Sequence, residues 1–173
     1  MTEEFRNPSG GRIQRGCPIS FQFNGRRYTG FLGDTLASAL IANGVSVVGR
    51  SQKYHRPRGI MSAGLEETNA FVQLAGNDDE PNRLATTLPI HDGLVAHSVN
   101  ATPSADFDVA SLLGFFHRFI PAGFYYKTFM WPRDKWDWYG RRIRKVAGWG
   151  TAPAEPEGGG YEHRNHPCDV LVV

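Results

Sequence analysis

The feature that most constrains the fold of this chain is an Asn24-Gly25 pair that lies between two apolar segments. Before the pair, three apolar residues alternate with polar ones: Ile19, Phe21 and Phe23. After it, residues 28–31 continue the pattern. Asn-Gly favours a two-residue turn with positive φ, and such turns join antiparallel strands. The sequence therefore predicts a β-hairpin over residues 19–31.

The segments after the hairpin predict one helix and several short strands. Asp34 is the expected N-cap of a helix that begins at residue 35 and ends at Asn43-Gly44. Short apolar segments at 45–48, 70–74, 84–90 and 94–99 are typical of strands. A mixed sheet of four or five strands crossed by one helix is a β-grasp arrangement, within the α+β class. The two-strand opening and the single early helix exclude a repetitive βαβ fold.

Between the helix and the strand at 70–74 lies a long loop, residues 49–64. It places four cations and His55 around Tyr54, and it contains Pro57 and no long apolar run. Loops of this length inside a compact domain are usually functional or disordered, and the regular segments on both sides favour order. A solvated basic loop that binds nothing is the alternative.

Three cations of this loop are candidate ligands for a cofactor: Lys53, Arg56 and Arg58. Guanidinium groups bind phosphate through paired hydrogen bonds, so the Arg56-Pro57-Arg58 segment could hold a phosphate or a pyrophosphate. Equally, these cations could pair with carboxylates of other domains. The sequence does not decide whether His55 has a structural or a chemical role. Ser62 has no evident histidine partner that could activate its hydroxyl. We therefore predict no catalytic residue in this chain.

Charge and cysteine usage limit the class of protein. The net charge of +2 and the pI near 8.6 give no electrostatic case for nucleic acid. The two cysteines, Cys17 and Cys168, are separated by most of the chain, which favours a reducing compartment over a disulfide framework. Residues 1–10 are polar, and no apolar run approaches the roughly 20 residues of a spanning helix. We expect a soluble, cytoplasmic protein with no membrane partner.

The histidines do not form a metal motif. Their spacing matches no known ligand pattern, and we expect surface histidines and no metal site at His91, His97, His117, His163 and His166.

Composition changes along the chain predict five successive parts. They are a flexible N-terminal arm (1–16), the β-grasp domain (17–100), an aromatic-rich helical extension (101–147), a linker (148–168) and the truncated first strand of a further domain (169–173). The aromatic residues at 124–131 could form a stacking platform for nucleic acid. Since basic residues do not alternate with them, a buried interface is the better interpretation. The final apolar run is typical of the first strand of a doubly wound domain, whose phosphate loop would follow.

Several blocks of sequence resemble one family. They are FQFNGRRYTGFLG (21–33), DTLASAL (34–40), VGRSQKYHRPRGIMSAG (48–64), PNR (81–83), DGL (92–94) and PAGFYYKTFMWP (121–132). These blocks resemble the N-terminal region of the alpha subunit of heterotetrameric sarcosine oxidase, and the resemblance covers residues 10–173. Two long blocks at the expected separation are more specific than any short motif.

The resemblance implies a complex of alpha, beta, gamma and delta subunits. Such a complex oxidises sarcosine to glycine, gives hydrogen peroxide and passes a one-carbon unit to tetrahydrofolate. It also implies NAD bound by a Rossmann-type domain of the alpha subunit, FAD bound by the beta subunit, and a covalent FMN between the two. None of these cofactors is expected in this chain.

A ferredoxin-like β-grasp domain raises the question of an iron–sulfur cluster. Plant-type ferredoxins hold two irons with C-x4-C-x2-C and a distant fourth cysteine. That spacing falls on Ser62, Glu67 and Ala70, with Thr86 as the fourth position. None is a cysteine, and Cys17 and Cys168 are not spaced for a cluster, so we predict that none is bound.

Two hypotheses of different class remain. In the first, the chain is the structural N-terminal part of a sarcosine oxidase alpha subunit, and is inactive alone. In the second, it is a free-standing β-grasp adaptor that uses the cluster-type loop for recognition. A subunit of a related amine or opine oxidase is a variant of the first.

Overall fold

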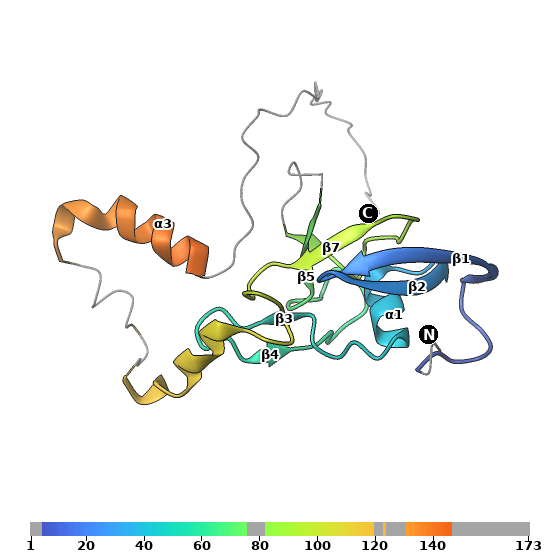
Figure 1. Cartoon of the computed structure of the whole chain (residues 1–173), viewed down its shortest axis with the longest axis horizontal. Helices are drawn as coiled ribbons and strands as arrows, with labels where there is room; N and C mark the ends of the chain where they lie inside the picture. The colour runs from blue at the N-terminus through green and yellow to red at the C-terminus, as the bar shows by residue number, and fades with distance from the viewer. Residues whose placement is uncertain (1–4, 76–81, 120–122, 124–130, 147–173) are drawn as a thin grey trace, which may run out of the picture.

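A computed structural model describes residues 5–75, 82–119, 123 and 131–146 of the 173 residues. It contains a five-stranded sheet, a two-stranded ribbon, one helix against the sheet, and a helical extension (Figure 1). The strands are β1 (Gln14–Phe23), β2 (Arg26–Leu32), β3 (Gly49–Arg50), β4 (Pro57–Arg58), β5 (Phe71–Leu74), β6 (Arg83–Leu84) and β7 (Val95–Ser98). The helical elements are α1 (Leu36–Ala42), η1 (Val109–Gly114), η2 (His117–Phe119), η3 (Arg133–Lys135) and α3 (Trp136–Val146).

The five-stranded sheet has the order β2-β1-β7-β5-β6. β1 pairs antiparallel with β2 and parallel with β7, while β5 pairs antiparallel with both β7 and β6. The predicted α+β class and mixed sheet are therefore confirmed. The hairpin is confirmed too, because Asn24 and Gly25 both have positive φ, 49° and 78°, between β1 and β2.

Helix α1 begins one residue later than predicted. Thr35 is the N-cap, and its side-chain oxygen accepts the Ser38 N–H at 3.2 Å while the Ser38 hydroxyl accepts the Thr35 N–H at 3.0 Å. This reciprocal pair is a capping box with serine in the place of glutamate. The predicted cap, Asp34, instead binds the Ser38 hydroxyl and the Arg6 guanidinium.

The core lies between α1 and the sheet. Phe21 and Phe23 of β1 pack with Leu36 and Leu40 of α1 and with Val72 of β5, and all five are fully buried. The alternation that predicted β1 and the helical spacing that predicted α1 therefore both mark buried faces.

The predictions of strands at 45–48 and 84–90 are wrong. Residues 45–48 lie outside any strand, and the segment 84–90 forms a strand only at its first residue, as the end of β6. Most of the second segment pairs with the start of α1 instead: the N–H groups of Leu36 and Ala37 donate to the carbonyls of Leu88 and Ala85. The first-turn N–H groups of a helix need such acceptors, and an apolar pattern does not reveal them.

The N-terminal segment differs from the expected flexible arm. β1 begins at Gln14, and Arg6 forms a two-pronged ion pair with the buried Asp34 carboxylate, with N···O distances of 3.1 and 2.7 Å. The Phe5 N–H also donates to the Ala42 carbonyl. Because a buried carboxylate requires a partner, the described part of the arm is tied to α1.

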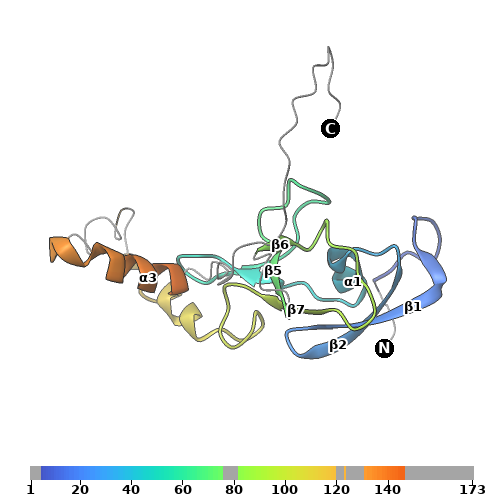
Figure 2. The same cartoon turned by 90° about the horizontal axis from the view of Figure 1, so that it is seen from above.

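The helical extension lies at one end of the molecule, away from the sheet, in both views (Figures 1 and 2). It contains η1, η2, η3 and the eleven-residue helix α3. The linker predicted at 148–168, the strand predicted at 169–173 and most of the aromatic strip at 124–131 lie outside the described residues. Within the described ranges, no helix is both long enough and apolar enough to cross a membrane.

Candidate functional site

The basic loop contains a small antiparallel ribbon that the sequence did not predict. β3 and β4 pair Gly49 with Arg58 and Arg50 with Pro57. At the tip of the ribbon, Lys53 and Arg56 both place their cations over the Tyr54 ring, 5.0 and 4.9 Å from its centroid. Lys53 and Arg56 thus share an aromatic ring, a favourable contact for a cation.

Arg50 fastens this ribbon to the segment that follows β7. Its guanidinium donates to the carbonyls of Ala105 at 2.7 Å, His55 at 3.1 Å and Asp106 at 3.1 Å. Its backbone N–H donates to the Asn100 side chain at 2.8 Å. Three carbonyls around one guanidinium match the planar fork of arginine and do not match the single ammonium of lysine.

A buried histidine–aspartate pair lies next to this clamp. His55 Nδ1 is 2.6 Å from Asp108 Oδ2, and the two side chains are 4% and 0% exposed. The other Asp108 oxygen accepts the N–H groups of Thr102 and Ala110. Among the described residues, His55 Nε2 is buried with no hydrogen-bond partner. The pair joins the basic loop to the segment that begins η1.

Sequence reasoning left the role of His55 open and missed Asp108. A signal for Asp108 was present, since it directly precedes the apolar segment of η1 and caps that element by accepting the Ala110 N–H. No sequence signal pairs it with a histidine 53 residues earlier.

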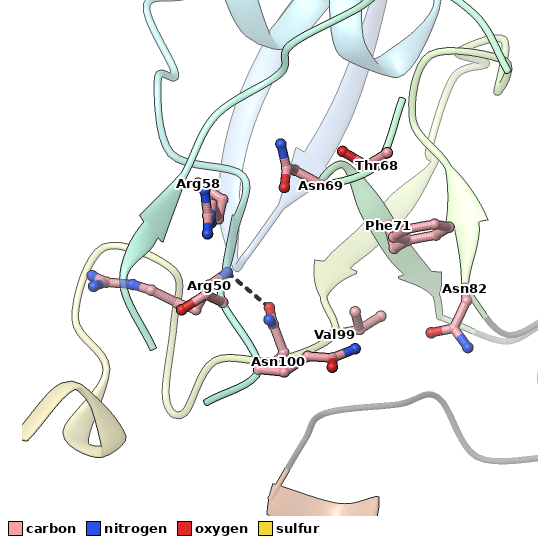
Figure 3. A pocket seen from close by; sticks show the side chains of 10 residues that line it. Arg50, Arg58, Thr68, Asn69, Phe71, Asn82, Val99 and Asn100 are labelled. Carbon is pink, nitrogen blue, oxygen red and sulfur yellow. Dashed lines mark hydrogen bonds between the residues drawn. The ribbon is translucent and has the colours of Figure 1, made fainter. Parts of the chain in front are cut away.

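A polar pocket of about 320 Å³ lies beside the ribbon (Figure 3). Arg58 lines it, together with Asn69, Phe71 and Asn100, and none of the described lining residues is acidic. Of the three candidate cofactor ligands, only Arg58 lines this pocket, while Lys53 and Arg56 lie at Tyr54. The structure therefore does not bring the three together around one phosphate-sized site.

The remaining loop, residues 59–70, is organised around the carboxylate of Glu67. One oxygen accepts the N–H groups of Met61 at 2.7 Å and Ser62 at 2.8 Å, and the other accepts the Asn69 N–H at 2.7 Å. Burial raises the pKa of the Glu67 carboxyl, but these backbone N–H groups and that of Ala70 outweigh burial and hold the pKa below its ordinary value. The group is therefore an anion at neutral pH.

The structure brings the four positions of the cysteine spacing to this loop. The Ser62 N–H donates to the Glu67 carboxylate, and the Ala70 N–H contributes to the lowered pKa of that carboxyl. Thr86 reaches the same loop from the other side, with its hydroxyl donating to the Gly64 carbonyl at 2.6 Å. The Ser62 hydroxyl is buried without a partner among the described residues.

Metal ligands do not gather in the described part of the chain. His91, His97 and His117 are exposed, and no three His, Cys, Asp or Glu side chains of the described residues could hold one ion. The remaining candidates, His163 and His166, lie outside the described residues.

Residues 16–101 match a family model described as a 2Fe-2S iron-sulfur cluster binding domain. The residues present do not fit such a cluster, because each iron of a plant-type cluster requires two thiolates. The only cysteines of the sequence are Cys17, which is exposed near the start of β1, and Cys168, outside the described residues. The orphaned Ser62 hydroxyl and the Glu67 carboxylate are hard oxygen donors that do not replace thiolates.

Two curated proteins that are similar to this chain are both named sarcosine oxidase subunit alpha. The chain is 49% identical over 98% of its length to "Sarcosine oxidase subunit alpha" of Rhizobium meliloti (strain 1021), of which it spans 17%. It is 40% identical over 51% of its length to the subunit of that name from Corynebacterium sp. (strain U-96), of which it spans 10%. The resemblance found in the sequence is thus confirmed: the chain is similar over 98% of its length to a sarcosine oxidase alpha subunit, and residues 16–101 match the model of a 2Fe-2S iron-sulfur cluster binding domain.

Proposed function

We propose that this chain is the structural part of a cytoplasmic sarcosine oxidase alpha subunit, and that it acts in assembly and not in catalysis. The oxidation of sarcosine, with NAD, FAD, FMN and tetrahydrofolate as cofactors, belongs to the rest of the complex. The high identity to an alpha subunit of which the chain spans 17% supports this assignment.

The observation that carries the proposal is an uncovered aromatic surface on the extension. Phe115, Phe119 and Trp131 are 81%, 75% and 81% exposed, and further apolar side chains around them are exposed as well. Exposed apolar side chains that gather on one segment often mark an interaction site, and aromatic residues are enriched in interfaces. The surface fits a partner face within the same complex, formed by the rest of the alpha subunit or by the beta, gamma or delta subunit.

The described residues offer little for catalysis. The His55–Asp108 pair is enclosed, and the pocket beside Arg58 contains neither a nucleophile with a base nor a pair of carboxylates. These facts favour an assembly role over an enzymatic one.

The adaptor hypothesis has one observation of its own. Met61 and Leu65, which precede Glu67 in the loop 59–70, are 76% and 80% exposed. Exposed apolar residues on a loop are also suited to binding a partner. The experiment must therefore distinguish the aromatic surface of the extension from the surface of the loop 59–70.

The test is copurification of the tagged full chain with flavin-bearing subunits from its native cells, with partners identified by mass spectrometry. We expect Phe115→Ser with Phe119→Ser to reduce recovery of oxidase subunits at least about tenfold, since two interface aromatics contribute more than 1.4 kcal/mol together. Met61→Ser with Leu65→Ser is the matched control. Loss of oxidase subunits from the control alone, or sarcosine oxidation by the isolated chain, would contradict the proposal.

A further inference from the structure

The loop 59–70 has a backbone arranged for an anion, although it contains no regular element. Its N–H groups at Met61, Ser62 and Asn69 all lie within 2.8 Å of the Glu67 carboxylate oxygens. Glu67 is 3% exposed and has no cation as an ion-pair partner among the described residues. Backbone N–H groups therefore provide its counter-charge, as in the concave anion sites formed by successive amides.

The position of this carboxylate connects it with the family of the domain. A plant-type cluster spacing falls on Ser62, Glu67 and Ala70; the Ser62 N–H donates to the Glu67 side chain, and the Ala70 N–H helps to lower the pKa of that carboxyl. Iron–sulfur clusters also depend on hydrogen bonds to their sulfurs. The same backbone donors can therefore serve either an inorganic sulfide or a carboxylate oxygen.

We propose that the Glu67 carboxylate is the internal anion around which the loop 59–70 folds, in the place that this family of domains reserves for a two-iron cluster. The domain matches a cluster-binding family but lacks the thiolates that a cluster needs. The proposal gives a physical explanation of this disagreement. A loop that lost its cluster would leave buried N–H groups unpaired, and each unpaired group destabilises the fold. One glutamate pairs at least three of them.

The proposal also assigns a latent ligand site. If the Glu67 side chain is shortened, the N–H groups of Met61, Ser62 and Asn69 remain as donors around a space that one carboxylate filled. Small monocarboxylates such as formate and acetate carry the same two oxygens. They are therefore the ligands that this loop should bind in a shortened variant.

The first test compares Glu67→Gln with Glu66→Gln in the full chain. Glu66 is the exposed neighbour, so its variant controls for charge and sequence position. We expect Glu67→Gln to lower the melting temperature by roughly 5–10 °C at pH 7 and Glu66→Gln to change it by less than about 2 °C. Equal effects of the two variants would overturn the proposal.

The second test asks whether an added anion replaces the side chain. Melting temperatures of Glu67→Ala are measured with sodium formate, sodium acetate or sodium chloride at equal ionic strength. We expect the two carboxylates to restore at least half of the lost melting temperature, with chloride and the wild-type chain showing no such gain. Equal behaviour of all three salts would contradict an anion site.

The third test uses the wild-type chain, so it does not depend on a variant that folds. Backbone amide proton shifts of Met61, Ser62 and Asn69 are followed by NMR during acid titration. We expect the three to move together with a midpoint below the ordinary glutamate pKa, since all three donate to one carboxyl group. Independent behaviour of these amides, or stoichiometric iron and acid-labile sulfide in the purified chain, would overturn the proposal.

Discussion

At the scale of single residues, this chain shows two ways to keep a buried carboxylate ionised. Asp34 pairs with the Arg6 guanidinium, while Glu67 relies on backbone N–H groups. For Asp34, burial raises the pKa, but hydrogen bonds from Arg6, the Phe31 N–H and Ser38 outweigh it and hold the pKa below its ordinary value. Both carboxylates therefore stabilise the fold at neutral pH, and both fix a segment that has no regular structure of its own.

The Asp34 pair gives a prediction about stability and pH. We expect Asp34→Asn to lower the free energy of unfolding by about 3 kcal/mol at pH 7, because it removes the buried negative charge that the Arg6 guanidinium binds. A depressed folded pKa means that this contribution is complete above the unfolded pKa and is lost as the pH falls through the folded one. Urea denaturation between pH 7 and pH 3 should therefore show the wild-type and variant curves converging in acid.

Asp106→Asn is the control for that experiment. Asp106 and Arg26 form an ion pair in which both side chains are more than half exposed, and exposed pairs contribute at most about 1 kcal/mol. If Asp106→Asn lowered the free energy of unfolding as much as Asp34→Asn does, the buried contacts of Asp34 would contribute no more to stability than an exposed ion pair, and the prediction would be wrong.

The same residues show why sequence reasoning reached only part of the site. The cluster spacing led to Glu67 because it is a local pattern of fixed separation. The partner of Asp34 lies 28 residues away in a segment that composition marked as flexible, and one arginine among many polar residues carries no local signal. The sequence cannot distinguish Asp34 from Thr35 as the N-cap, because the two residues are adjacent and both are preferred at that position.

At the scale of elements, prediction succeeded where structure is determined locally. The hairpin and α1 are encoded by a turn pair, an alternation and a helical spacing within single segments. The ribbon β3–β4 and the short strand β6 are two residues long in each strand and exist through their partners, which periodicity cannot detect. The ribbon is also fastened from outside, by the Arg50 contacts to the segment after β7.

Arg50 therefore provides a test of the ribbon. We expect Arg50→Lys to lower stability by about 1–2 kcal/mol and to increase hydrogen exchange at residues 101–114 before exchange rises in α1, since the donors of an ammonium lie on one nitrogen and cannot replace the three separate nitrogens of the guanidinium. Hydrogen exchange with mass spectrometry measures both regions at once. Arg58→Lys is the matched control, because the Arg58 guanidinium forms no hydrogen bond or ion pair with the described residues. If hydrogen exchange in Arg50→Lys increased in α1 before it increased at residues 101–114, the prediction would be wrong.

At the scale of the whole molecule, stability and surface are unevenly distributed. Every residue of the buried apolar cluster lies between Phe21 and Ala96, and Ala105 is the only buried apolar side chain after Ala96 among the described residues. The extension beyond η1 adds exposed aromatic residues and, as far as the structure describes it, no core. The domain and its uncovered surface are thus separable.

Truncation tests this separation. A chain that ends after Gly114 keeps Ala105, Asp108 and the contacts of Arg50. We expect its melting temperature to stay within about 3 °C of the full chain, since the core is unchanged. We also expect less self-association in light scattering after size exclusion, because the exposed aromatic residues beyond η1 are gone. A large loss of melting temperature would show that the extension belongs to the fold.

The parallel pairing of β1 with β7 has a consequence for how the chain is made. β7 occupies the centre of the sheet and is the last of its strands to leave the ribosome, so the hairpin must wait about 70 residues of synthesis for its neighbour. During that interval one edge of β1 is unpaired, and unpaired edges invite contact with other nascent chains. The stage of greatest risk for this domain is therefore translation, just before Ser98 is released from the exit tunnel.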